Sequence, residues 1–321
     1  MTNPGVHQRS GATSLTGLRD NNEDAYLLRD TGMGSGAAIA ALAVADGMGG
    51  YEDGQVASRL AIDMAGRVLG DGAADSASIQ QAFARADEKI RTVAMADGSR
   101  RSMGTTLTFA VVHQGEALVG HVGDTRAWLF HQGSLQQITA DHSRVGRLLR
   151  AGVITEEDAI GHPDANVLEQ ALGAGDRPSV DMYRLGVGPG DVLLLSSDGM
   201  HGSVHREEIE AMLREHLSMQ DVCDRLASLA LAKGSSDNVT VVAWKHPVAG
   251  RRTLTNPGSP APVAAAAPRT SASTRLLAPA PAIAPTPSAA AARGYERLQV
   301  LAGGFAVGFT LGVILYLLGR R

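Results

Sequence analysis

The sequence predicts an α+β fold in which two mainly antiparallel sheets pack face to face as a sandwich, with helices outside. Strand-like runs come in groups and helix-like segments in pairs, without the regular alternation that is typical of a parallel sheet. The 321 residues are 44% apolar and 4% aromatic, so Val, Leu, Ile and Ala have to fill the core. Several strand-like runs stop at an aspartate, and such acids can converge in the cleft between two sheets.

The first elements surround a glycine-rich turn. A short strand-like run at 25–28 follows Glu23 and Asp24, and the apolar run 39–45 stops at residues 46–50, Asp-Gly-Met-Gly-Gly. Glycines after a carboxylate let the backbone turn tightly and bring a carbonyl or N–H close to an ion or phosphate. An ordinary Asp-Gly turn is the alternative.

Two helices and a group of strands follow. Apolar residues at helical spacing predict amphipathic packing helices over 55–69 and 76–96. Three strand-like runs with Gln-Gly pairs as turn sites then have the pattern of a β-meander. The runs cover 107–112, 117–122 and 127–130, and the turn sites are 114–115 and 132–133.

Residues 139–177 predict a small helical insertion between strands. Ser143 and its neighbours can cap a helix over 144–150, Gly152 can end it, and a second helix starts near 155–158. Such an insertion beside a ligand-bearing rim suits a lid or recognition flap, and a plain surface connection is the alternative. The remaining elements are a strand at 192–197, helices at 206–217 and 219–232, and a strand at 239–244.

Carboxylates mark the ends of these strands. Asp46, Asp124 and Asp198 close three of them, and Asp237 and Glu23 stand just before two others. Gathered on one rim without cysteine or paired histidines, they are the ligands that Mg²⁺ or Mn²⁺ prefers. The sequence therefore predicts a site for hard divalent ions.

Four other side chains are assigned structural roles. His113, His121 and His131 have no metal-ligand spacing, and we expect satisfied or solvated imidazoles. Cys223, the single cysteine, lies in a predicted helix beside acids that raise a thiol pKa, which favours a small core residue over a reactive thiol.

Charge is divided unevenly along the chain. All but one of the 33 acidic residues lie before residue 246, whereas eight of the 29 basic residues lie after it. The basic excess is scattered and lacks interleaved aromatic residues, so we expect no nucleic-acid partner. Residues 1–16 have no signal-peptide pattern, so the head, residues 1–245, is expected in the cytoplasm.

The tail predicts a linker and a membrane anchor. Residues 246–297 are rich in Pro and Ala and cannot build a core. Residues 300–318 carry no charge and are long enough to span a bilayer as a helix, so we expect a single transmembrane helix over 298–318 in the inner membrane. Gly304, Gly308 and Gly312 recur every fourth residue, a weak signal for a helix dimer.

Seven ordered motifs resemble those of the metal-dependent serine/threonine protein phosphatases of PPM type (type 2C), in their bacterial form. The likeness covers about residues 5–245 and implies a four-layer αββα sandwich with two Mg²⁺ or Mn²⁺ ions. The motifs are Arg19 with Asn22-Glu23-Asp24, Asp46-Gly47-Met48-Gly49-Gly50, Met103-Gly104-Thr105-Thr106, Gly123-Asp124-Thr125-Arg126, Asp141-His142-Ser143, Ser197-Asp198-Gly199 and Asp237-Asn238.

The resemblance also implies a role for each site residue. Asp46 would bridge both ions, Asp198 and Asp237 would bind the first, and the Gly47 carbonyl and Glu23, through water, would bind the second. Asp24 would hold metal-bound water. Asp124 with Asp198 would bind a third, weaker ion. Arg19 would grip the substrate phosphate.

These assignments imply a chemistry. Two divalent ions lower the pKa of the water between them, and the resulting hydroxide attacks phosphorus in line without a covalent enzyme intermediate. Some relatives carry His where this chain has Met48, which cannot donate a proton, so metal-bound water is the preferred acid for the leaving oxygen.

The sequence thus predicts a membrane-tethered cytoplasmic phosphatase that acts on phosphoserine or phosphothreonine in proteins and opposes a Ser/Thr kinase. One alternative is an inactive phosphatase-like sensor that binds a phosphorylated partner. Another is a stress-response phosphatase that acts on a small regulator by partner switching.

Overall fold

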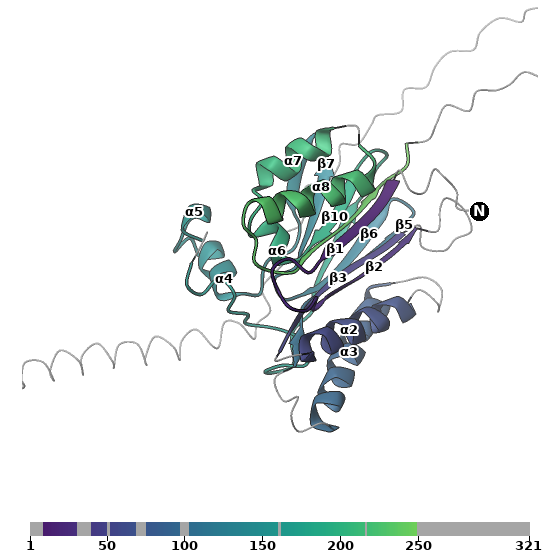
Figure 1. Cartoon of the computed structure of the whole chain (residues 1–321). Helices are drawn as coiled ribbons and strands as arrows, with labels where there is room; N and C mark the ends of the chain where they lie inside the picture. Colours follow the sequence, from purple (N-terminus) through teal and green to yellow (C-terminus); the bar gives the residue numbers. More distant parts are fainter. Residues whose placement is uncertain are drawn as a thin grey trace, which may run out of the picture. The chain divides into compact units, whose positions relative to one another are not determined.

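The computed structural model describes residues 9–30, 40–49, 52–68, 75–96, 103–159, 162–215 and 217–248 (Figure 1). The chain divides into two units, Met1–Thr255 and Asn256–Arg321. The predicted linker beyond Val248, the membrane helix over 298–318 and its glycine face lie outside the described residues. Among the helices that are described, none is both long and apolar enough to cross a bilayer.

Two antiparallel sheets form the centre of the first unit. The first sheet orders its strands as β1 (Ser10–Leu15), β11 (Val239–Lys245), β10 (Val192–Ser196), β7 (Arg126–His131) and β8 (Ser134–Gln137). The second has β2 (Asp24–Asp30), β3 (Ala40–Met48), β5 (Leu107–His113), β6 (Glu116–Val122) and β9 (Asp181–Gly186), with β4 (Gly104–Thr105) paired to β3.

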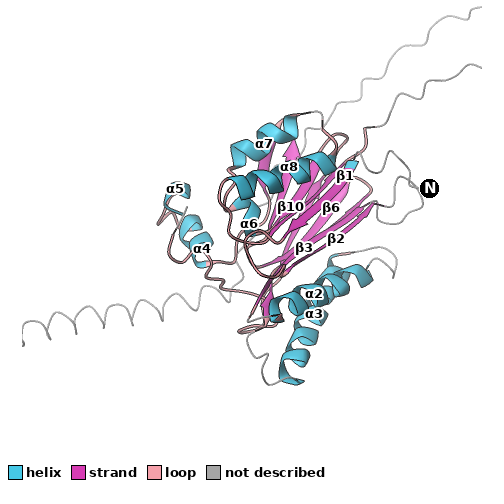
Figure 2. Cartoon of the chain, viewed as in Figure 1, coloured by secondary structure: helices cyan, strands magenta, loops and turns pink. Residues whose placement is uncertain are grey.

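The predicted four-layer arrangement is confirmed by three buried apolar clusters. One lies between the second sheet and helices α2 (Asp53–Val68) and α3 (Ser76–Ala96), and one lies between the two sheets. The third lies between the first sheet and helices α7 (Arg206–Arg214) and α8 (Met219–Ala232). Figures 1 and 2 show these helix pairs on opposite sides of the sheets. The helices are α2 (Asp53–Val68), α3 (Ser76–Ala96), α4 (Arg144–Arg150), α5 (Glu156–Ala159), α6 (Asp198–His201), α7 (Arg206–Arg214) and α8 (Met219–Ala232).

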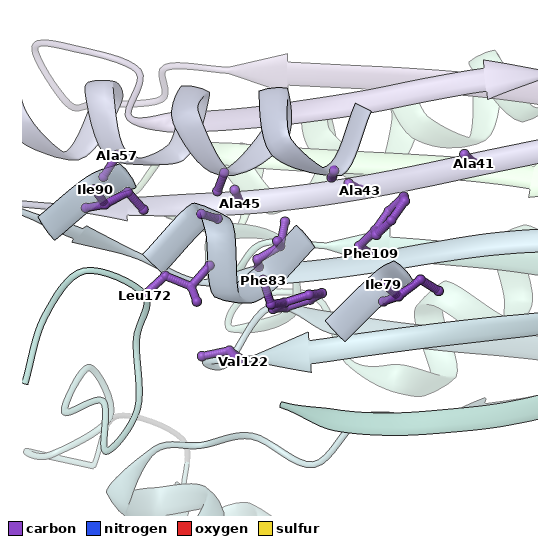
Figure 3. Packing of buried hydrophobic residues seen from close by; sticks show 14 of the residues in the cluster. Ala41, Ala43, Ala45, Ala57, Ile79, Phe83, Ile90, Phe109, Val122 and Leu172 are labelled. Carbon is purple, nitrogen blue, oxygen red and sulfur yellow. The ribbon is translucent and has the colours of Figure 1, made fainter. Parts of the chain in front are cut away.

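Strand β3 has two faces of different use. Its residues Ala41, Ala43 and Ala45 pack in the cluster beneath α2 and α3, where small side chains let the helix layer approach the sheet (Figure 3). Leu42 and Val44 alternate with them and face the other sheet. Asp46 continues that second series, so the alternation directs its carboxylate into the space between the sheets.

Local patterns predicted most elements accurately. Helices 76–96, 144–150 and 219–232 are confirmed at both ends, and Ser143 caps α4 by accepting from the Gly146 N–H at 3.1 Å. Both Gln-Gly turns are also confirmed. Their residues have positive φ, 50° and 80° at 114–115 and 50° and 82° at 132–133, as tight hairpins with the right-handed strand twist require.

One expectation about the strands is wrong, and three strands were not predicted. The β-meander breaks after β6, because residues 123–125 carry the chain into the other sheet, where β7 pairs with β10 and β8. The sequence also gave no indication of β1, β8 and β9. All three are edge strands, which need less apolar surface than central strands and therefore carry a weaker pattern.

Candidate active site

Two aspartates meet across the end of the second sheet. Asp24 on β2 is the register partner of Asp46 on β3, so both side chains lie on the face directed at the other sheet. Ser197, which follows β10 of the first sheet, donates its hydroxyl to Asp24 Oδ2 at 2.7 Å and accepts from the Thr240 N–H at 2.9 Å. These bonds join the two sheets at the carboxylates.

The first sheet brings two further acids to this end. Asp198 is the first residue of α6, directly after β10, and Asp237 precedes β11, the antiparallel neighbour of β10. Arg19 Nη2 donates to Asp237 Oδ2 at 2.8 Å, while its side chain remains 53% exposed. Arg19 is therefore a cation at the mouth of the site with exposed surface for an anion.

The backbone around Asp46 is held from both sides. The Asp46 N–H donates to Thr106 Oγ1 at 2.9 Å, and its carbonyl accepts from the Thr105 hydroxyl at 2.8 Å and the Thr106 N–H at 2.9 Å. A Cβ on Gly47 would overlap the carbonyl oxygen of Gly54 in α2, so only glycine allows this approach. The Met-Gly-Thr-Thr motif thus fixes the strand end that carries Asp46.

Electrostatics at this end disfavour a full set of ionised carboxylates. Burial, and then repulsion from Asp24, Asp198, Asp124 and Asp237, raises the pKa of Asp46 well above its ordinary value. Burial is also the main cause that raises the pKa of Asp24 to about 7 and that of Asp124 well above its usual range. The pKa values of Asp198 and Glu23 are raised mainly by burial as well. A bound positive charge would relieve this repulsion.

The residues fit divalent ions in one further respect. Asp24 Oδ1 and Asp198 Oδ1 are buried and have no hydrogen-bond partner among the described residues, so both have free ligand capacity. No three acidic, histidine or cysteine side chains in the described ranges are arranged to hold an ion by themselves. An ion here would need the other ligands that the resemblance implies, the Gly47 carbonyl and water.

The predicted site residues lie near one another in the folded chain. Asp46 interacts electrostatically with four of the other acids, and Glu23 with Arg19 and Asp237, so the predicted site residues gather at one end of the sandwich. Asn238 fixes Glu23 by accepting its N–H at 2.8 Å and donating to the Thr16 and Asn21 carbonyls. The individual metal-binding and catalytic roles stay predictions.

Sequence reasoning left one polar network without a role. Arg126 makes a bidentate ion pair with Asp141, at 2.7–3.1 Å, and lies 5.6 Å from the Trp128 ring centroid. His142 bonds to Gly123 and to Asp181. The motifs at 123–126 and 141–143 contained these residues, but their mutual pairing is a long-range property that neither motif indicates.

The histidine expectation is partly wrong. His131 is satisfied by Asp191 at 2.8 Å, and His121 Nδ1 by the Thr108 hydroxyl at 2.9 Å. His121 Nε2 and His113 Nε2 are buried without a partner in the described part of the chain. Burial lowers the pKa of His121 to about 3, so its ring is neutral. Cys223 is buried as expected, and burial followed by Asp224 raises its thiol pKa.

Comparisons with known proteins identify the family and the fold of this chain. The family model for protein phosphatase 2C matches residues 18–233. The serine/threonine phosphatase stp of Listeria innocua is 34% identical over 209 residues, covering 62% of this chain and 81% of that protein. The solved serine/threonine phosphatase PstP/Ppp of Mycobacterium tuberculosis has a TM-score of 0.68 and 34% identity, covering 75% of this chain and 99% of that one.

A second solved structure contains metal. The catalytic domain of the serine/threonine protein phosphatase PstP in complex with two manganese ions has a TM-score of 0.65 and 33% identity, covering 74% of this chain and 98% of that one. The family resemblance carried by the seven motifs is therefore confirmed. The chain belongs to the protein phosphatase 2C family and is a protein serine/threonine phosphatase.

Proposed function

We propose that this phosphatase works with two bound Mn²⁺ or Mg²⁺ ions and with a third, weaker ion beside Asp124. The observation that carries the proposal is the buried group of Asp24, Asp46, Asp124 and Asp198, with raised pKa values and two carboxylate oxygens that lack hydrogen-bond partners. The manganese complex of the PstP catalytic domain supports it.

The strand ends support a ligand role for each acid. Asp46, which interacts with acids of both sheets, would be the ligand that the two ions share. Asp198 and Asp237 would bind the first ion, and the Gly47 carbonyl and Glu23, through water, would bind the second. Asp24 is held by Ser197 through Oδ2, and its Oδ1, unpartnered among the described residues, would accept a hydrogen bond from metal-bound water. When bound, two divalent ions in such a site supply a water of lowered pKa and neutralise charge on phosphoryl oxygens.

Arg19 would bind the substrate phosphate at the mouth. Its guanidinium is planar and permanently charged, so it can donate two parallel hydrogen bonds to phosphate oxygens. Asp237 holds it at 2.8 Å and directs it toward the acids. The leaving serine or threonine oxygen needs a proton, and Met48 has none to give, so water in the site would supply it.

The chain would work at a membrane surface. Residues 298–318 would anchor it in the inner membrane, with the catalytic domain in the cytoplasm at the end of the linker. Such a tether raises the effective concentration of the phosphatase near membrane-bound phosphoproteins. These would include the substrates of a Ser/Thr kinase at the same membrane. Comparing phosphorylated membrane and cytosolic proteins with and without the chain tests this part.

The chemical part is tested by phosphate release from a phosphothreonine peptide with added Mn²⁺. We expect Asp46→Asn and Asp198→Asn each to lower kcat/KM by about 10²–10⁴-fold, because each removes a ligand that supports several kcal/mol of stabilisation. Asp63→Asn, an exposed acid on α2, is the matched control and should leave the rate unchanged.

A different result would favour one of the alternatives. A pure, folded wild-type chain that releases no phosphate with either Mn²⁺ or Mg²⁺ would favour the phosphatase-like sensor. Turnover of a single small regulatory protein, with phosphothreonine peptides left intact, would favour the partner-switching phosphatase.

A further inference from the structure

The turn that carries Asp124 lies where the chain crosses from one sheet to the other. It follows β6 of the second sheet and precedes β7 of the first. Gly123 has φ +109°, and both of its backbone groups bond to His142. The Gly123 N–H donates to His142 Nδ1 at 3.3 Å, and the His142 N–H donates to the Gly123 carbonyl at 2.6 Å. His142 therefore holds this turn as a neighbouring strand would.

The ring of His142 is itself held in one orientation. Because Nδ1 accepts a hydrogen bond from the Gly123 N–H, the ring proton lies on Nε2, which donates to Asp181 Oδ2 at 3.2 Å. Tyr183 donates to the same oxygen at 3.2 Å, and its hydroxyl accepts from the Ala140 N–H at 3.2 Å. Asp181 and Tyr183 both belong to β9, so a sheet strand anchors the ring.

The opposite side of the turn is closed. A Cβ on Gly123 would lie 2.5 Å from Thr106, the residue that also binds the Asp46 backbone. The turn is thus confined between Thr106 and His142, and Asp124 is only 8% exposed. With so little free space, the position of its carboxylate depends on the position of the turn.

His142 would act on Asp124 by geometry and not by charge. The ring faces the turn with Nδ1, which accepts the Gly123 N–H and therefore carries no proton on that side. The cation next to Asp124 is Arg126, which is engaged by Asp141 through a bidentate pair. A neutral side chain that accepts a hydrogen bond from the Gly123 N–H should therefore be able to take over the role of His142.

We propose that His142 is a positioning residue for Asp124. Its ring, anchored by Asp181 and Tyr183, fixes the Gly123–Asp124 turn where the Asp124 carboxylate can bind an ion. This inference rests on the proposed function, in which Asp124 holds the third, weaker ion. Residues that orient metal ligands in this way change metal affinity by about 10–100-fold when they are replaced.

The test is a Mn²⁺ titration of the metal-free chain, with free Mn²⁺ followed by electron paramagnetic resonance. Asn at position 142 places an amide oxygen where Nδ1 lies, whereas Gln reaches the Nε2 position and leaves Gly123 without an acceptor. Asp124→Asn is the reference for loss of the weak site. His131→Asn is the matched control, because His131 also pairs with an aspartate but lies at the end of β7 remote from Asp124.

We expect His142→Ala, His142→Gln and Asp124→Asn to weaken the low-affinity Mn²⁺ phase by about 10–100-fold, and His142→Asn and His131→Asn to retain it. The tighter Mn²⁺ phases should stay unchanged in all five variants. Thermal unfolding in EDTA identifies any variant that does not fold. The comparison of His142→Asn with His142→Gln then tests the hydrogen bond to Gly123, because both side chains are neutral amides and only Asn reaches the Nδ1 position.

Two results would overturn the proposal. One is a low-affinity Mn²⁺ phase that His142→Ala and His142→Gln leave unchanged, or that His142→Asn weakens as much as His142→Gln does. The other is a weak phase that is missing in the wild type or unaffected by Asp124→Asn. Failure of the proposed function is a separate observation, since a chain that binds Mn²⁺ as expected but releases no phosphate would refute only the catalytic assignment.

Discussion

The two faces of strand β3 lead into regions of opposite chemistry. On one face Ala41, Ala43 and Ala45 lie in an apolar layer with α2 and α3, where the described side chains bury carbon against carbon. On the other face the series of Leu42 and Val44 ends in Asp46, in a group of acids that repel one another. One strand therefore contributes stability along its middle and reactive groups at its end.

We expect the helix–sheet layer to carry the stability of the metal-free chain. Apolar burial in the helix–sheet layer is favourable whether or not ions are present. The carboxylate end has to be built against desolvation and repulsion, and it becomes favourable only when a cation is bound. Substitutions in the two regions should thus differ in sign as well as in size.

The largest expected effect belongs to Phe83 in the helix–sheet layer. Its ring is fully buried and packs against Gly120 of β6, where a Cβ would lie 2.7 Å from the ring. Phe83→Ala should lower the free energy of unfolding by about 3–5 kcal/mol, because it removes buried surface and leaves a cavity. Urea unfolding in EDTA measures it.

The matched control for this substitution lies on the same helix. Met95 is 81% exposed, so Met95→Ala should change the free energy of unfolding by no more than about 0.5 kcal/mol. A loss below about 1 kcal/mol for Phe83→Ala would mean that the layer can collapse around the gap and does not carry the stability assigned to it.

Much of this division is readable from the sequence. Helical spacing gave the packing helices, and acids at the ends of apolar runs gave Asp46, Asp124 and Asp198, because both signals are local. The crossing between sheets at Gly123 could not be predicted, since β6 and β7 have the same local pattern as a hairpin. The bond from His142 to Asp181 joins residues 39 apart and depends on the final packing of β9.

A buried aspartate that has its cation gives the contrast to the active-site acids. Asp87 on α3 is 5% exposed, and both of its carboxylate oxygens accept from Arg91 Nε, at 2.9 and 3.0 Å. Its Oδ1 also accepts from the Gly173 N–H at 2.8 Å. Asp87→Asn should lower the free energy of unfolding by about 1–3 kcal/mol, because it weakens a charge-assisted pair and leaves Arg91 without its anion.

Urea unfolding in EDTA again provides the measurement, and Glu88→Gln is the control, since Glu88 is an exposed acid on the same helix. Equal stability of Asp87→Asn and the wild type would show that the pair contributes no net stability, as is found for many ion pairs near a surface.

The same substitution at Asp46 should have the opposite sign. In EDTA at pH 8, Asp46→Asn should raise the free energy of unfolding by about 0.5–2 kcal/mol, because it removes one charge from a buried group of like charges. In saturating Mn²⁺ the order should reverse, since only the wild type gains the full stabilisation from ion binding.

The pH dependence decides whether repulsion is the cause. The pKa values of Asp46 and Asp24 are raised in the folded chain, that of Asp24 to about 7, so between the ordinary aspartate pKa and this value the folded state binds more protons than the unfolded state. Stability in EDTA should therefore fall as the pH rises through this window, and the advantage of Asp46→Asn should be small near pH 4 and large at pH 8.

Urea midpoints at pH 4, 5, 6, 7 and 8 measure the stability curves of the wild type and of Asp46→Asn. Parallel curves would mean that Asp46→Asn acts through packing, and the contrast between the two faces of β3 would then not be electrostatic.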